Sequence, residues 1–228
     1  MSTITKSHWL FLGFRTILFV LAILNTYIDS LVNSTFSVVC SVGTWLFFII
    51  SMVNRLFPAK KDTASMGNQK IFKKNFIPTD VKAIKRDTKS AVIVALVWLF
   101  LNSIFAVLYF NNIIDNNFML LLSLFYSVCD IICIVIYCPF QRWFMKNKCC
   151  TTCRIYNWDY IMMFTPLVFV PNVYNYSLFI MSLIVFIMWE VTYYRFPERF
   201  HEETNDNLKC KNCKEFMCRN KFRKVAKN

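Results

Sequence analysis

The sequence predicts an all-α membrane protein, a polytopic helical bundle of about six transmembrane spans. Of its 228 residues, 57% are hydrophobic and only 17% are charged, whereas roughly a quarter of the residues in a soluble domain are charged. Several apolar runs approach the ~20 residues that a helix needs to cross the hydrocarbon core of a bilayer. These runs are continuously apolar rather than alternating, which argues against a transmembrane β-barrel.

The first two apolar runs predict a transmembrane hairpin over residues 1–58. They cover about Trp9–Ile28 and about Phe36–Phe57, and the polar turn between them contains no Lys or Arg. Arg15 interrupts the first run, and no small-residue cleavage site follows it. We therefore interpret the first run as a transmembrane helix rather than a signal peptide.

Residues 59–90 predict a basic cytoplasmic linker. From Thr79 onward the pattern indicates a helix that continues into a third span, about Ala91–Ile114. On one face of this helix, the spacing i, i+3, i+4 and i+7 brings together Lys82, Lys85, Arg86 and Lys89. Basic residues beside a membrane attract anionic lipid headgroups. The expected partners are the lipid bilayer and its anionic headgroups, and no nucleic acid is expected.

A second transmembrane hairpin is predicted over residues 91–138, with a fourth span at about Phe118–Cys138. A cytoplasmic cysteine loop is predicted over residues 139–158, and a basic cytoplasmic tail that carries a second C-x-x-C pair over residues 197–228.

A third transmembrane hairpin is predicted over residues 159–196, with a sixth span at about Tyr176–Phe196. Pro166 and Pro171 interrupt the run that precedes it, Tyr156–Tyr174, and proline breaks a continuous helix. We interpret that run as a short or kinked fifth span, and a re-entrant hairpin is the alternative.

The distribution of basic residues predicts the orientation. All 26 Lys and Arg residues fall in four places. These are the N-terminus of the chain together with the cytoplasmic part of the first span, and residues 55–90, 142–154 and 195–227. Six spans bring all of these segments to one side, and basic loops stay in the cytoplasm. We therefore expect a multi-pass protein of the cell inner (plasma) membrane with both termini in the cytoplasm.

Two cysteine pairs predict a small cytoplasmic metal knuckle. Cys150-x-x-Cys153 lies in the loop and Cys210-x-x-Cys213 in the tail, and four thiolates suit the tetrahedral coordination of Zn²⁺. Cys149 and Cys218 are possible additional ligands. Arg154 and Lys214 stand where many such knuckles have Gly. An iron ion, an iron–sulfur cluster, a dithiol redox pair and reduced cysteines that bind nothing remain alternatives.

Three ionisable residues lie inside apolar spans, where charge is costly and usually faces the bundle interior. These are Arg15, Asp130 and Glu190. Counted along the helices from the cytoplasmic ends of their spans, they lie at similar depths, roughly 9–12 Å. We expect one intramembrane polar cluster, in which Arg15 pairs with Glu190 or Asp130. It either fixes helix packing or binds a proton, an ion or a small polar ligand.

A resemblance to uncharacterised bacterial multi-pass membrane proteins is carried by the segment CPFQRWFMKNKCCTTCRIYNWDYIMMFTPL. It covers mainly residues 138–167, with the 210–213 pair as a further point of similarity. The resemblance implies a bacterial inner membrane and carries no known activity, so it transfers no catalytic residue.

No grouping of nucleophile and base and no pair of catalytic carboxylates is evident, and the 3 glycines of the chain exclude a glycine-rich nucleotide loop. An enzyme is therefore not indicated, although a cysteine-based oxidoreductase stays open. The first hypothesis is a membrane scaffold or regulator with a structural four-cysteine zinc site. The others are a redox protein that uses bound iron or a dithiol, and a small transporter with a polar site at Arg15, Asp130 and Glu190.

Overall fold

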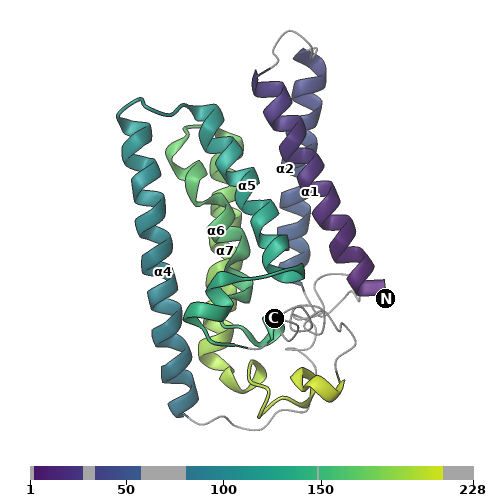
Figure 1. Ribbon diagram of the computed structural model, residues 1–228, viewed down its shortest axis with the longest axis vertical. Helices are drawn as coiled ribbons and strands as arrows, with labels where there is room; N and C mark the ends of the chain where they lie inside the picture. The colour runs from purple at the N-terminus through teal and green to yellow at the C-terminus, as the bar shows by residue number, and fades with distance from the viewer. Residues whose placement is uncertain (1–2, 28–33, 58–80, 148, 213–228) are drawn as a thin grey trace, which may run out of the picture.

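The structure, a computed structural model, describes residues 3–27, 34–57, 81–147 and 149–212. All regular secondary structure in these ranges is helical, which confirms the all-α prediction. The α-helices are α1 (Thr3–Tyr27), α2 (Ser34–Leu56), α4 (Val81–Phe110), α5 (Asn116–Val135), α6 (Asp159–Phe164) and α7 (Val173–Arg195). Figure 1 shows them as a bundle of long, roughly aligned helices.

Five of these helices are long and apolar enough to cross a membrane: Lys6–Thr26, Val39–Leu56, Thr88–Phe110, Asn116–Val135 and Val173–Arg195. They correspond to the first, second, third, fourth and sixth predicted spans. Large apolar side chains such as Leu10, Leu96 and Phe100 are exposed on their outer faces. Apolar surface of this extent is suited to lipid rather than water, so the prediction of a membrane protein is confirmed.

The stretch predicted as the fifth span is a chain of short helices. A 3-10 turn at Tyr156–Trp158 leads into α6, a second 3-10 helix covers Thr165–Phe169, and Val170 is extended. The prolines explain both changes. Pro166 has no N–H for an α-helical bond and lies in the first turn of the second 3-10 helix, and Pro171 forces the residue before it out of the helical region.

These short helices run along the bundle. At their start, Asp159 is bonded to Arg55 near the C-terminal end of α2. At their far end, the Phe169 ring meets Phe110 at the C-terminal end of α4, with 5.9 Å between centroids. The segment therefore carries the chain from one end of the bundle to the other, and α7 returns beside it (Figure 1). We call the end where α2 and α7 finish the loop end.

The core forms where α6 is enclosed by its neighbours. α1 packs on α5, α2 packs on α7, and α6 lies against both α5 and α7. The largest core cluster joins Phe48 and Met52 of α2, Phe164 of α6 and Trp189 of α7. α4 contacts the rest of the bundle mainly through the Thr165–Phe169 helix and a π-helical turn at Phe140–Phe144.

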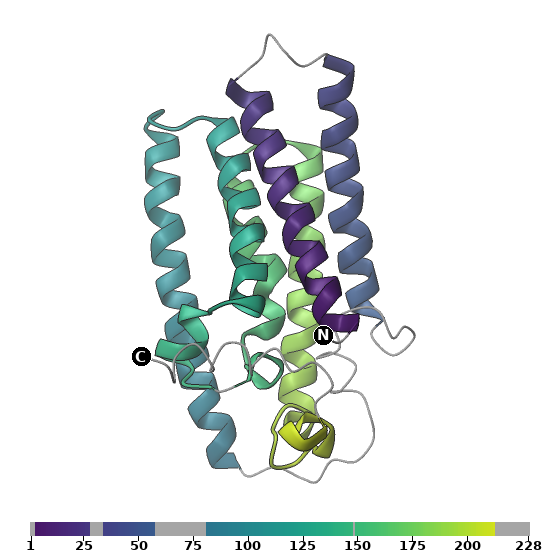
Figure 2. The ribbon, with the colours of Figure 1, turned by 45° about the vertical axis from the view of Figure 1, so that its right-hand side comes forward.

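The tail folds back under α7. Short 3-10 turns at Pro197–Arg199, Asp206–Leu208 and Cys210–Asn212 follow the helix (Figure 2). Phe200 and Leu208 are buried in the same cluster as Trp189. Asn205, which is fully buried, donates to the Arg199 carbonyl at 2.8 Å and accepts from the Asn207 amide at 3.0 Å. The tail is thus anchored to the bundle at the loop end up to residue 212.

Candidate functional site

Arg15 of α1 forms a buried ion pair with α5. Its Nη1 atom donates to Asp130 Oδ2 at 2.9 Å and to the Ser127 carbonyl at 2.8 Å. The guanidinium also lies over the Phe48 ring, 5.7 Å from the centroid. Arg15 therefore ties α1 to α5 and packs against α2.

A second buried pair joins α2 to the start of α6. Arg55 Nη2 lies 2.8 Å from Asp159 Oδ2, and Arg55 Nη1 donates to Asp159 Oδ1 at 2.9 Å. Arg55 also lies over the Tyr160 ring at 4.9 Å. Two parallel bonds between a guanidinium and a carboxylate fix orientation as well as distance, so this pair fixes where the broken helical segment begins.

The third pair connects the cysteine loop to α7. Arg154 Nη1 donates to Glu190 Oε1 at 2.6 Å, and Nη2 donates to Glu190 Oε2. Trp158 Nε1 donates to the same carboxylate at 2.7 Å. The guanidinium covers the Tyr193 ring, 3.7 Å from its centroid. Arg154, one residue after Cys153, thereby attaches the loop to α7.

The expected single cluster of Arg15, Asp130 and Glu190 is therefore divided. The structure brings Arg15 and Asp130 together, as one of the two predicted alternatives had it, whereas Glu190 is bonded to Arg154 and Trp158. Depth along a helix can be counted in the sequence, but the direction in which a side chain leaves the helix cannot.

The ion pairs of Arg55, Asp159 and Arg154 were not predicted from the sequence, in which Arg55 marked the cytoplasmic side and Arg154 was noted as the residue in place of a knuckle glycine. One signal was present: an acid, Asp159, opens an apolar run directly after a cysteine loop, and an arginine, Arg55, closes another run. Two opposite charges at the ends of neighbouring spans are candidates for a pair.

Amide side chains organise the cysteine loop. Asn147 Oδ1 accepts from the Cys149 amide at 3.1 Å, and Asn147 Nδ2 donates to the Thr152 carbonyl at 2.9 Å. Gln141 Nε2 donates to the Asn147 carbonyl at 3.1 Å, and Cys150 Sγ donates to Gln141 Oε1 at 3.2 Å. These bonds satisfy backbone groups that have no partner in regular secondary structure.

The two C-x-x-C pairs begin in similar turns. Cys150 opens the 3-10 turn Cys150–Thr152, closed by a bond from the Cys153 amide to the Cys150 carbonyl at 3.0 Å. Cys210 opens the 3-10 turn Cys210–Asn212. Both turns lie at the loop end (Figure 1). Cys149 and Cys153 are buried, and Cys213 and Cys218 lie outside the described residues.

Within the described ranges, no three His, Cys, Asp or Glu side chains gather closely enough to hold a metal ion. The predicted four-thiolate site includes Cys213, outside those ranges, so it stays a prediction. The predicted basic face lies at the start of α4, where Lys89 is exposed. The side chains of Lys82, Lys85 and Arg86 lie outside the described residues.

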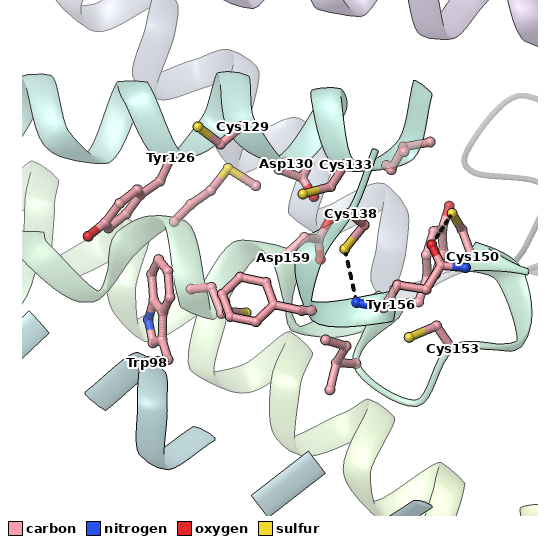
Figure 3. A pocket seen from close by; sticks show the side chains of 16 residues that line it. Trp98, Tyr126, Cys129, Asp130, Cys133, Cys138, Cys150, Cys153, Tyr156 and Asp159 are labelled. Atoms are coloured by element: carbon pink, nitrogen blue, oxygen red, sulfur yellow. Dashed lines mark hydrogen bonds between the residues drawn. The ribbon is translucent and has the colours of Figure 1, made fainter. Parts of the chain in front are cut away.

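A cavity of about 130 Å³ lies between α4, α5, α6 and the cysteine loop. Five cysteines line it (Figure 3), together with both methionines of α6: Cys129, Cys133, Cys138, Cys150, Cys153, Met162 and Met163. Asp130 and Asp159 also reach its wall. In the sequence alone, Cys129 and Cys133 flank Asp130 on one helix face. That spacing could suggest a metal site, but packing between helices is the preferred interpretation, and no pattern connects these cysteines with Cys150 and Cys153.

Comparison with protein-family models, curated proteins and solved structures finds no match to this chain. The functional argument therefore rests on the geometry of the chain itself.

Proposed function

We propose that this protein is a membrane scaffold or regulator in which a structural zinc ion fastens the cysteine loop to the tail. Cys150, Cys153, Cys210 and Cys213 would be its ligands. The observation that carries the proposal is that the first cysteine of each pair, Cys150 or Cys210, opens a 3-10 turn at the same end of the bundle. A short turn of this kind presents two thiolates to one ion.

The buried ion pair at Arg154 supports the same arrangement. Arg154 follows Cys153 directly and is bonded to Glu190 of α7, and the tail with the second pair continues from the end of α7. An arginine in place of the usual glycine thus has a structural role: it attaches the first knuckle to the helix that leads to the second.

The tail, which is anchored to the bundle, would supply the other two ligands, Cys210 and Cys213, of this zinc site, which we call the zinc clamp. Leu208 is buried in the core cluster that also contains Tyr160, and Cys210 follows two residues later. The backbone at Cys210 is therefore held in place before any metal binds. This reduces the conformational entropy that the tail loses when the metal binds.

The topology that goes with this function has six crossings. The five long helices and the Asp159–Phe169 segment would each cross once, with both termini in the cytoplasm of a cell whose plasma membrane holds the protein. The broken segment is enclosed by α4, α5 and α7, and irregular backbone is tolerated at membrane depth only when protein surrounds it.

Metal analysis of the purified protein tests the function. We expect about one zinc ion per chain and a colourless solution, since Zn²⁺ has no visible transitions. Cys150→Ser combined with Cys210→Ser should lose the zinc, whereas Cys40→Ser should retain it, because Cys40 lies in α2 towards the opposite end of the bundle.

Visible charge-transfer bands and bound iron in place of zinc would favour the redox alternative. A metal-free protein whose stability is unchanged by the double substitution would refute the clamp.

A further inference from the structure

Two of the cavity cysteines, Cys133 and Cys138, belong to neither C-x-x-C pair and lie near each other on the cavity wall (Figure 3). Cys133 lies in the last turn of α5, and Cys138 follows three residues after the helix ends. The Gln141 amide donates to Cys138 Sγ, at 3.4 Å. Metals bind the thiolate form of cysteine, so an ion at this site has to displace the thiol protons.

The backbone around this pair departs from the α-helical pattern. The Tyr137 amide reaches the Ile132 carbonyl at 3.1 Å, an i to i+5 bond. The Phe140–Phe144 turn that follows is π-helical, with the Met145 amide bonded to the Phe140 carbonyl at 3.0 Å. Such wide turns are frequent at functional sites. Here they turn Cys138 back towards Cys133 across the end of α5.

The surroundings select a soft ion. Apart from the pair itself, the cavity wall carries mostly soft sulfur groups, with two carboxylates: Cys129, Cys150, Cys153, Met162, Met163, Asp130 and Asp159. Thiolate and thioether ligands favour Cu(I) over hard cations. A closed four-ligand site of the zinc type is not formed in this part of the structure, where no three His, Cys, Asp or Glu side chains converge. A monovalent d¹⁰ ion accepts two ligands, which a thiol pair supplies.

We infer that Cys133 and Cys138 form a second metal site, one that binds a cuprous ion at the wall of the cavity. On binding, both thiols lose a proton to solvent, and two Cu–S bonds form without any change of oxidation state. Met162 is placed on the same wall as a third, weaker ligand. This inference does not depend on the zinc clamp, since it uses neither C-x-x-C pair.

The cavity also gives the ion a route in. Cys150 and Cys153 line the same space as Cys133 and Cys138 (Figure 3), and the loop that carries them lies at the loop end. An ion that enters from the loop end therefore need not cross the apolar faces of α4 and α5.

Competition for Cu(I) tests the inference. The full-length protein in detergent, reduced and kept anaerobic, would be titrated with Cu(I) against a coloured cuprous chelator. In a Cys150→Ser, Cys210→Ser background, in which the paired thiolates of the proposed zinc site no longer compete for Cu(I), we expect one tightly bound equivalent. Adding Cys133→Ser or Cys138→Ser should weaken the affinity at least ~10-fold, because each removes one of two ligands. X-ray absorption should show only sulfur neighbours around copper.

Two control variants separate this site from the zinc clamp. Cys40→Ser should bind Cu(I) like the wild type. Cys150→Ser with Cys210→Ser should lose zinc but keep the copper equivalent. Cys138→Ala provides a second test, since Cys138 lies outside α5. Undiminished Cu(I) affinity after Cys138→Ala or Cys133→Ser in that background would overturn the inference.

Discussion

At the scale of single residues, the buried arginines determine how the helices are joined. Arg15, Arg55 and Arg154 each contact a carboxylate on a segment distant in sequence, and each is at most 10% exposed. Removal of one partner of a buried pair leaves an uncompensated charge, which costs about 3–5 kcal/mol in soluble proteins. The pairs therefore specify which helices meet, even where they add little net stability.

A double-mutant cycle distinguishes the observed partner of Arg15 from the other predicted one. Arg15→Leu should lower the free energy of unfolding by about 3 kcal/mol, because Asp130 is left unpaired. Adding Asp130→Leu should restore part of that loss, with a coupling energy of about 1–3 kcal/mol. Thermal unfolding of the detergent-solubilised protein provides the measurement.

Glu190→Leu is the matched control for this cycle. It removes a carboxylate at similar depth, but its partner is Arg154. Its effect should simply add to that of Arg15→Leu. Coupling between Arg15 and Glu190, with none between Arg15 and Asp130, would contradict the structure.

At the scale of elements, the sequence predicted the five long helices well and the connections poorly. Long apolar runs bounded by charges and polar turns mark α1, α2, α4, α5 and α7 directly. Pro166 and Pro171 also predicted that the next stretch would not be one helix. The π-helical turn at Phe140–Phe144 has no such signal, because it depends on bonds between the loop and Asn147 or Cys150 that form only after folding.

The candidate site was predictable to a lesser degree. Spacing identified the C-x-x-C pairs, but the proximity of Cys133 and Cys138 depends on a non-α-helical turn after α5. The partner of Glu190 depends on the rotation of α7 about its axis. α7 is apolar on most of its circumference, so no amphipathic stripe reveals that rotation.

Docking of the tail should depend on Leu208. Leu208 is 3% exposed and packs in the main core cluster, and truncation of a buried leucine typically costs about 2–5 kcal/mol. We expect Leu208→Ala to weaken this packing and to expose the tail. Limited proteolysis should then cut between residues 196 and 212 several-fold faster than in the wild type.

Val191→Ala is the appropriate comparison, because Val191 is an exposed residue of α7. It should leave the cleavage rate unchanged. Equal cleavage rates in wild type and Leu208→Ala would indicate that the tail is not held by this contact.

At the scale of the whole molecule, the arrangement of the helices makes a topological prediction. The Asp159–Phe169 segment reaches from the Arg55 end of the bundle to the Phe110 end. If the two ends of the bundle face opposite sides of the membrane, residues 111–115 and 171–172 lie on the outer side. The basic segments around residues 82–89 and 195–211 then lie in the cytoplasm.

Reporter fusions check this arrangement. A fluorescent reporter that folds only in the cytoplasm should be bright when fused after residue 147 or after residue 212, and dark when fused after residue 113 or 172. Brightness at 172 together with darkness at 212 would mean that the Asp159–Phe169 segment re-enters rather than crosses.

The proline-broken segment has a consequence for biosynthesis. Its backbone groups near Pro166 and Pro171 cannot all be bonded within the segment, and an isolated stretch of this kind is poorly accepted by hydrocarbon. α5 leaves the ribosome before it and α7 after it. We expect the segment to stay at the insertion machinery until α7 has been made, so that both enter the bilayer together as one hairpin against α5.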